Sequence, residues 1–378
     1  MDFKLTEEQE MIKKSAREFA ETVIAPKVAA MEETDEMPEE ILKGLGEYGF
    51  LGLTIPTEYG GNGLGHVARM IVLEEIGRVS AAVAMTLQVL ALGIEPIVQF
   101  GTEEQKNKYL PGLAKGELFS TVAVTEASGG SDPTAAQTRA HKEGDEWVIN
   151  GRKVFITNAH LADVATVFAR TADEPKPSFS CFLLEKGMEG FRPGRKEHKV
   201  GFKGCDTGDL IMENCRVPES QMLGKEGDGL KIALKAISEV GRPGMTGCAL
   251  GILAASLEAA VKFANERILY GKPISKLQAI QFKIANMYTD LEAARLLAWR
   301  AAALKDRGER CDVEMAMAKV FSSEAAVRAA NAAVEIHGGY GCMMEYPTQR
   351  YLRDASLLAP SAGTSDIMRI VIARAALG

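Results

Sequence analysis

The chain has 378 residues, of which 46% are apolar and 25% are charged, and its formal net charge is −7. These proportions are typical of an ordinary globular protein, and the length exceeds the size at which one hydrophobic core stops growing, so we expect two or three domains. The acidic balance argues against a nucleic-acid-binding surface, which would need clustered lysines and arginines.

The cysteines and the apolar runs bear on the cellular setting. Six cysteines are scattered along the chain without a C-x-x-C pair, so we expect reduced thiols, a cytoplasmic location and no metal site. Residues 1–8 are polar and acidic where a signal peptide would be apolar. The apolar runs are too short to span a bilayer, so we expect no membrane insertion.

The N-terminal third shows helical periodicity. Thr6 and Gln9 have the spacing of a capping box, and apolar residues then fall on one helical face as far as Pro26. Thr102 and Gln105 repeat the capping pattern before a helix that reaches residue 110. Further helices are expected at 38–48, 67–77 and 81–100. Residues 1–117 are therefore predicted to form an all-helical domain.

Residues 118–225 have a different character, with short runs of β-branched and aromatic residues separated by turn residues. Turns are expected at 143–145 and at Asn150-Gly151. The close spacing of the runs predicts a compact antiparallel barrel or sandwich, and the resemblance described below favours a β-barrel domain. The runs lie at 120–124, 147–149, 153–156, 164–169, 179–184 and 210–212.

Residues 226–378 return to helical spacing. Long apolar periodic runs at 232–270, 278–306 and 312–337 are broken by glycines, which predicts a four-helix-bundle domain. The many small residues indicate close helix packing, also between subunits. The predicted fold class is therefore α+β and multidomain.

Two motifs in the central region resemble those of flavin-dependent acyl-CoA dehydrogenases. Residues 124–132 read Val-Thr-Glu-Ala-Ser-Gly-Gly-Ser-Asp, similar to the family's Thr-Glu-Pro-x-Ala-Gly-Ser-Asp. The resemblance implies that Val124, Thr125 and Ser131 contact the flavin edge, with Ser131 also near the pantetheine of a thioester. Phe155-Ile-Thr157 is similar to the family's Trp-Ile-Thr/Ser, which implies an aromatic wall and a hydroxyl beside the flavin.

Two motifs in the C-terminal region extend the resemblance over the whole chain. Residues 266–271 read Glu-Arg-Ile-Leu-Tyr-Gly, like the family's Glu-Arg-x-x-Phe-Gly. By resemblance, Arg267 pairs with the FAD pyrophosphate, often across a subunit boundary, Tyr270 flanks the adenine side, and Gln278 follows at the usual spacing. In residues 335–341, Gly338 and Gly339 allow close backbone approach to a phosphate. Glu335 replaces the usual Gln and would repel a phosphate unless it is protonated or paired.

The C-terminal loop departs from the family pattern. The family reads Tyr-Glu-Gly-Thr, and its Glu is the base that removes the α-proton; this chain reads Ser361-Ala362-Gly363-Thr364. Gly363 and Thr364 are kept, and Thr364 or Ser365 can cap the helix that follows. The family's alternative base position corresponds to Gly241, so neither position carries a titratable group.

The missing base leaves three interpretations open. In the first, an FAD-dependent dehydrogenase desaturates a bulky or alicyclic acyl-CoA, such as a cyclohexene-carboxyl-CoA, in the room left by two small residues and with a different base. In the second, the protein is a non-oxidative lyase, similar to a desulfinase of the family. In the third, it is a non-catalytic FAD-binding subunit. Weak candidates for the base are Glu95, Glu239 and Asp366.

The resemblance also implies the partners of the site. We expect FAD as cofactor, an acyl-CoA substrate, an electron-transfer flavoprotein as acceptor, and a homotetramer or a dimer. Arg242 corresponds to an arginine that contacts the CoA portion. The expected substrate-binding residues are Gln88, Ser131, Glu239, Gly241, Arg242, Ala362 and Gly363, and Asp366 joins the FAD-binding set.

Overall fold

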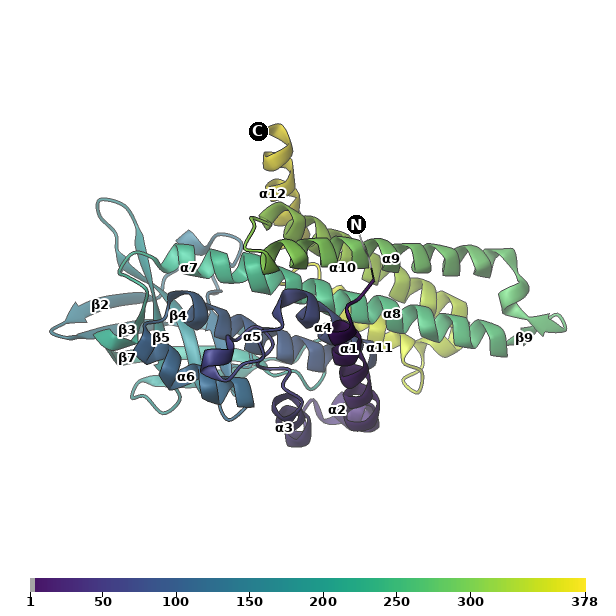
Figure 1. Ribbon diagram of the computed structural model, residues 1–378, viewed down its shortest axis with the longest axis horizontal. Coiled ribbons are helices and arrows are strands. Elements are labelled where there is room, and N and C mark those ends of the chain that lie inside the picture. Colours follow the sequence, from purple (N-terminus) through teal and green to yellow (C-terminus); the bar gives the residue numbers. More distant parts are fainter. Residues whose placement is uncertain (1–3) are drawn as a thin grey trace.

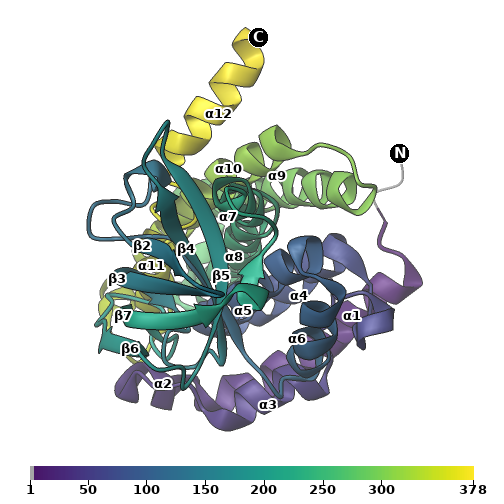
Figure 2. The same cartoon turned by 90° about the vertical axis from the view of Figure 1, so that its left-hand side faces the viewer.

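The computed structural model describes residues 4–378, so the first three residues of the polar N-terminal segment lie outside the described part. The molecule is elongated, with a β-sheet at one end and long helices running to the other (Figure 1). The N-terminal helices cover one side of both parts (Figure 2).

Local sequence signals fix the helices of the N-terminal region. Both expected capping boxes are present, at Thr6 with Gln9 and at Thr102 with Gln105. A π-helical turn (η1, Ala20–Ile24) and a 3-10 turn (η2, Ala25–Lys27) connect the first two α-helices at Pro26. The helices are α1 (Glu7–Phe19), α2 (Val28–Thr34), α3 (Glu39–Glu47), α4 (Gly65–Val79), α5 (Ala81–Phe100) and α6 (Glu103–Lys115).

The β region is an open mixed sheet, so the predicted closed antiparallel barrel is wrong. The strand order is β6-β7-β3-β2-β4-β5-β8, and among residues 4–378 the end strands β6 and β8 do not pair with each other. β1 pairs with β4 in parallel. The strands are β1 (Ser120–Ala123), β2 (Arg139–Glu143), β3 (Glu146–Thr157), β4 (Val164–Ala172), β5 (Ser178–Glu185), β6 (Phe191–Lys196), β7 (Thr207–Pro218) and β8 (Met222–Leu223).

Helices, and not further strands, cover the outer face of the central strands. Phe168 of β4 and Leu183 of β5 pack in one cluster with Ile97 of α5 and Leu113 of α6. The other face of the same strands packs against β3 and β7, with Val167 and Phe182 in a second cluster. β4 and β5 are therefore buried on both faces. The barrel prediction failed because the spacing of strands in the sequence does not show whether helices or other strands cover the outer face of a sheet.

One expected turn is confirmed and one is wrong. The turn at 143–145 joins β2 to β3 with Glu143 opposite Glu146. Asn150-Gly151 lies inside the continuous strand β3, where the pairing with β7 shifts between Ile149 and Gly151. A bulge uses the same permissive residues as a turn, which explains the wrong prediction.

The C-terminal region is helical, as expected. Within the run predicted at 232–270, the helix has a π-helical turn (η6, Ile237–Gly241) between α7 (Gly229–Ala236) and α8 (Arg242–Glu266). It ends before the hairpin β9 (Ile268–Leu269) and β10 (Lys272–Pro273). The remaining helices are α9 (Gln278–Asp306), α10 (Asp312–His337), α11 (Thr348–Ser356) and α12 (Ser365–Leu377), and a 3-10 turn η8 (Gly338–Cys342) follows α10.

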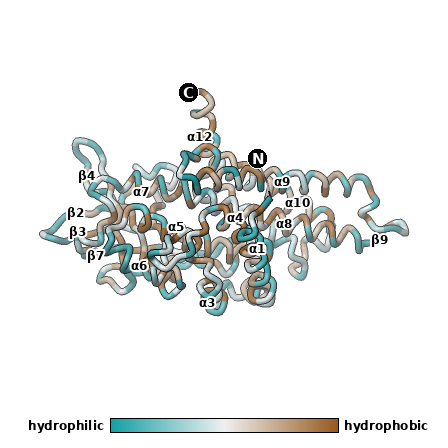
Figure 3. Tube along the Cα trace, in the orientation of Figure 1, coloured by the Kyte–Doolittle hydropathy of each residue, from teal (hydrophilic) through white to brown (hydrophobic). Residues whose placement is uncertain are grey.

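The central helices are strongly apolar (Figure 3). Contrary to expectation, α5 and the stretch Gly229–Glu266 are long and apolar enough to cross a membrane, but 89% and 83% of their most apolar windows are buried inside the protein. They are core helices of this fold. α4 packs closely on α8 through Gly77 and Gly251, where a Cβ on Gly251 would lie 2.5 Å from the Gly77 Cα.

Candidate functional site

The loop after β1 is held by a buried ion pair. Lys153 of β3 is completely buried, lies 2.7 Å from Glu126, and donates a hydrogen bond of 3.1 Å to the Val124 carbonyl. Glu126 also accepts hydrogen bonds from the backbone N–H groups of Gln137 and Thr138. Burial alone would raise the pKa of Glu126, but Lys153 and these donors hold it below its usual value. The pair fixes the segment that carries Val124 and Thr125.

Phe155 stands exposed in the next motif. Its side chain is 65% exposed, and its φ of +58° lies in the left-handed region that residues other than glycine rarely adopt. A strained backbone that presents an aromatic ring to solvent is typical of a binding site. Thr157, two residues further, ends β3, and its carbonyl accepts a hydrogen bond of 2.7 Å from the Thr121 hydroxyl.

The C-terminal motifs meet at the far end of the helices. Arg267, Glu335, Gly338 and Gly339 line one cavity of about 560 Å³. A Cβ on either glycine would meet nothing within 4 Å, so the space above the backbone is open to a ligand. Tyr270 is 91% exposed at a φ of +52°, in the hairpin beside this cavity.

Glu335 is paired. Lys283 forms an ion pair with it, and Asn331 donates a hydrogen bond of 2.9 Å to its carboxylate. The hydrogen bond from Lys283 lowers the pKa of Glu335, so the carboxylate is ionised and its charge is offset by the lysine. The repulsion expected from this residue toward a phosphate is thereby reduced.

The motifs of the β region and of the C-terminal region belong to different parts of the molecule. Phe155 lies on β3, in the sheet at one end, and the β9 hairpin that follows Arg267 is at the other end (Figure 1).

Gly241 and Ala362, which the resemblance assigns to the base positions, lie next to each other. A Cβ atom placed on Gly241 would lie 3.6 Å from the Ala362 Cβ and 3.7 Å from Leu92 Cδ1. Ala362 has a φ of +51°, and Gly363 follows at +94°. The Thr364 hydroxyl accepts a hydrogen bond of 3.2 Å from the Ile367 N–H and so caps α12, as expected. The structure thus brings Gly241, at the end of η6, and the loop before α12 together.

The three candidate bases are engaged elsewhere. Glu95 and Glu239 join Gln99 and Lys305 in one cluster, in which Lys305 lies 3.5 Å from Glu95 and Gln99 donates a hydrogen bond of 2.9 Å to Glu239. The Asp366 side chain is 89% exposed in the first turn of α12 and pairs with Arg369 at 3.2 Å. Their hydrogen-bond partners give each of them a role in holding the structure.

Sequence reasoning missed two buried cations near this region. Lys319 of α10 is fully buried and donates a hydrogen bond of 2.8 Å to the Ala359 carbonyl, in the loop that carries Ala362. Burial, together with the nearby charge of Arg242, lowers the pKa of Lys319 to about 8. Arg69 of α4 is the second buried cation. For both Lys319 and Arg69, the sequence signal that could have identified a buried cation is a charged residue within an otherwise apolar helical face.

Arg242 is nearly buried and donates a hydrogen bond of 3.1 Å to the Ser238 hydroxyl. Its Nε has no partner among residues 4–378. A contact of this guanidinium with the CoA portion of a ligand remains a prediction.

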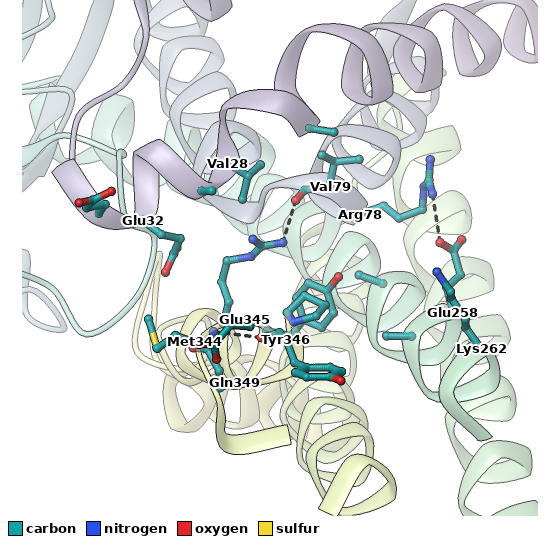
Figure 4. A pocket seen from close by; sticks show the side chains of 18 residues that line it. Val28, Glu32, Arg78, Val79, Glu258, Lys262, Met344, Glu345, Tyr346 and Gln349 are labelled. Carbon is teal, nitrogen blue, oxygen red and sulfur yellow. Dashed lines mark hydrogen bonds and ion pairs between the residues drawn. The ribbon is translucent and has the colours of Figure 1, made fainter. Parts of the chain in front are cut away.

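Cavity volume alone does not identify the site. A cavity of about 830 Å³ lies between α2, the end of α4, α8 and the segment before α11, and includes the ion pair of Arg78 with Glu258 at 3.0 Å (Figure 4). None of the residues predicted from the sequence to bind FAD or substrate lines it. The motif residues lie in other parts of the fold.

The fold and the motifs define a flavin-dependent oxidoreductase of acyl-CoA thioesters. Sequence models of the N-terminal, middle and C-terminal domains of acyl-CoA dehydrogenases match residues 6–117, 121–215 and 227–377. The chain therefore belongs to the acyl-CoA dehydrogenase family.

Individual relatives agree over the full length. The chain is 46% identical to an acyl-CoA dehydrogenase of Bacillus subtilis (strain 168), over 99% of both chains. It superposes with a TM-score of 0.98 and 44% identity on a chain from a study of the electron transferring flavoprotein of Acidaminococcus fermentans, covering 100% of both chains. An acyl-CoA dehydrogenase from Bacillus anthracis complexed with FAD matches with a TM-score of 0.92 and 33% identity, over 99% of this chain and 67% of that chain.

The residues present fit FAD. The exposed Phe155 ring is available to a planar ring system, and the open backbone at Gly338 and Gly339 beside Arg267 suits a pyrophosphate. When bound, FAD supplies the hydride acceptor for oxidation of an acyl-CoA. The protein is an FAD-containing enzyme of the acyl-CoA dehydrogenase type.

Proposed function

We propose that this enzyme desaturates a bulky or alicyclic acyl-CoA thioester, such as a cyclohexene-carboxyl-CoA, with a base other than the usual glutamate. The observation that carries the proposal is the pair Gly241 and Ala362. A Cβ on Gly241 would lie 3.6 Å from the Ala362 Cβ, 3.7 Å from Leu92 Cδ1 and 3.8 Å from Ile237 Cγ2, and we call the space beside Gly241 that these groups border the gap. Two larger side chains would fill that space.

In this proposal a complete FAD site would take residues from two copies of the chain. Val124, Thr125, Ser131, Phe155 and Thr157 would hold the flavin of one subunit. The cavity with Arg267 and Glu335 lies at the far end of the same chain, so it would serve the cofactor of a partner subunit. This separation supports a homo-oligomer, either a tetramer or a dimer.

Several further assignments belong to the same proposal. Tyr270 and Gln278 extend the partner-facing FAD site, Gly363 and Thr364 approach the flavin from the C-terminal loop, and Asp366 approaches it from the first turn of α12. Gln88, Glu239 and Arg242 face the substrate. An electron-transfer flavoprotein would accept the electrons, and the enzyme would work in the cytoplasm.

The test is an anaerobic half-reaction with the purified yellow holoprotein. Cyclohexanecarboxyl-CoA, cyclohex-1-ene-carboxyl-CoA and butyryl-CoA are added separately, while flavin absorbance is followed and the products are identified by mass spectrometry. We expect the alicyclic thioesters to bleach the flavin with a larger kcat/KM than butyryl-CoA. A larger kcat/KM for butyryl-CoA would contradict the proposal.

A variant tests whether space at Gly241 sets the preference. Gly241→Val keeps an allowed Cβ position and fills the gap with its two methyl groups, so it should lower kcat/KM for the ring substrates more than for butyryl-CoA. Gly241→Ala is the matched control and should change both substrates little. Product formation without bleaching would indicate a lyase, and neither product nor bleaching would indicate a non-catalytic subunit.

A further inference from the structure

Lys319 is a fully buried lysine with a single polar partner. It lies on α10, and its ammonium group donates a hydrogen bond of 2.8 Å to the Ala359 carbonyl, which is its one hydrogen-bond acceptor among residues 4–378. Burial, together with the charge of Arg242, lowers its pKa to about 8, so it still carries a charge at neutral pH. A buried charge is costly unless it is paired, so packing alone does not explain a lysine in this place.

No carboxylate forms an ion pair with this ammonium group in the described chain. Glu324, further along α10, acts on Lys319 through its electrostatic field and is itself paired with Arg369 of α12 at 2.5 Å. Arg242 is a cation and disfavours the charge of Lys319. The hydrogen bond to the Ala359 carbonyl is therefore the contact that the lysine makes, and it is a contact with a loop.

The Ala359 carbonyl closes the loop that carries Ala362. The same oxygen accepts a second hydrogen bond of 3.1 Å from the Ser365 N–H, so the loop 359–365 is closed where it begins and ends. Ala362 lies inside this loop at a φ of +51°, a strained conformation that the surroundings must maintain. A hydrogen bond from a charged donor contributes more than a neutral one. Lys319 therefore fastens the closed end of the loop to α10.

We propose, resting on the proposed function, that Lys319 is a positioning residue for the reaction, which holds the loop 359–365 so that Gly363 and Thr364 reach the flavin. The lysine acts through the Ala359 carbonyl. Because α10 packs against α8 and α9, this hydrogen bond ties the loop to the helical core. A misplacement of about 1 Å in an active site can lower a rate by about 100-fold, so the loop needs such an attachment.

The first measurement is hydrogen–deuterium exchange in the yellow holoprotein without a thioester. Lys319→Met has a similar shape and no donor. Hydrogen bonds to charged groups contribute about 1.5–3 kcal/mol, so peptides from residues 357–368 should exchange about 10- to 100-fold faster in this variant. Ser323→Ala is the matched control, because it removes a buried hydroxyl group one turn further along α10 that has no partner in the described chain. It should exchange as the wild type does.

The second measurement is the anaerobic rate of flavin bleaching at saturating thioester, with the compound that reduces the wild type fastest. We expect this rate to fall about 10- to 100-fold in Lys319→Met. The thermal unfolding temperature should stay at or above the wild-type value, because replacing a buried charge by an apolar group of similar volume is often neutral or stabilising. Lys319→Arg keeps a cationic donor and should recover part of the rate.

Two results would overturn the inference. One is equal exchange of the loop in the wild type and in Lys319→Met. The other is a Lys319→Met protein that unfolds at a lower temperature or does not fold, since the lysine would then support the whole fold and not the loop.

The outcome for Lys319 can be separated from that for the proposed function. If butyryl-CoA is oxidised faster than the alicyclic thioesters, the proposed function fails, whereas faster loop exchange and slower bleaching by butyryl-CoA in Lys319→Met would still support the role of the lysine. If no thioester bleaches the wild-type flavin, the proposed function fails and takes the role of Lys319 in the reaction with it.

Discussion

Restoring a glutamate at Ala362 tests whether this position is the vacant site of the base. Ala362 already has a φ of +51°, so Ala362→Glu adds no new backbone strain beyond that of any non-glycine residue. The Cβ to which the new side chain attaches lies 3.6 Å from the position that a Cβ on Gly241 would take, so the carboxylate enters the gap between the two positions. A positioned general base contributes about 10²- to 10⁴-fold in rate, which corresponds to roughly 3–5 kcal/mol of activation free energy.

The assay is the anaerobic rate of flavin bleaching by butyryl-CoA in a stopped-flow instrument. We expect Ala362→Glu to accelerate this reaction by about 10²- to 10⁴-fold over the wild type. Ala362→Gln has the same size and no basic carboxylate, so it is the matched control and should stay at the wild-type rate. Equal rates for the glutamate and glutamine variants would refute the assignment of this loop.

Three further outcomes follow from buried groups. Lys153→Met leaves Glu126 buried without its cation and should lower the free energy of unfolding by about 3–5 kcal/mol in urea denaturation. Adding Glu126→Gln removes the unpaired charge and should recover part of this loss. Equal stability of the single and double variants would contradict the prediction. Burial lowers the pKa of His66 to about 3 and raises that of Asp354 to about 7, so between pH 4 and 6 the unfolded chain protonates His66 and the folded chain protonates Asp354. His66 therefore makes stability rise with pH and Asp354 makes it fall, each by about 1.4 kcal/mol per pH unit, and the two slopes cancel. Relative to the wild type, the free energy of unfolding of His66→Gln should fall as pH rises in this range, and that of Asp354→Asn should rise. Both pKa shifts would be contradicted if urea denaturation gave the variants the same pH dependence of this free energy as the wild type. Gly251→Ala would place a Cβ 2.5 Å from a backbone Cα of α4 and should lower the melting temperature. Gly241→Ala is the control for adding a methyl group at a helical glycine, because its φ is −62° and its Cβ would come no nearer than 3.6 Å to another residue.

The sequence by itself determined the local elements and the family. The capping boxes at Thr6 and Thr102 lie where the spacing predicted them, because a cap depends on residues within one turn. The hairpin at 143–145 is likewise a local property. The family motifs are contiguous segments and could be recognised without the fold, as could the absence of a titratable side chain at Gly241 and Ala362.

Only the tertiary structure decided which distant residues meet. The sheet is open, and α5 and α6 cover the outer face of β4 and β5. The nearly continuous apolar runs of these strands indicate burial on both faces, but they do not encode which elements supply the cover. The sheet that contains β3 and the hairpin β9 lie at opposite ends of the molecule because of the way the long helices are oriented (Figure 1). Arg69 is one charged residue in an apolar helix until Gln88 and Val240 are brought to it from α5 and η6, because burial and the lack of a counter-charge are properties of the packed molecule.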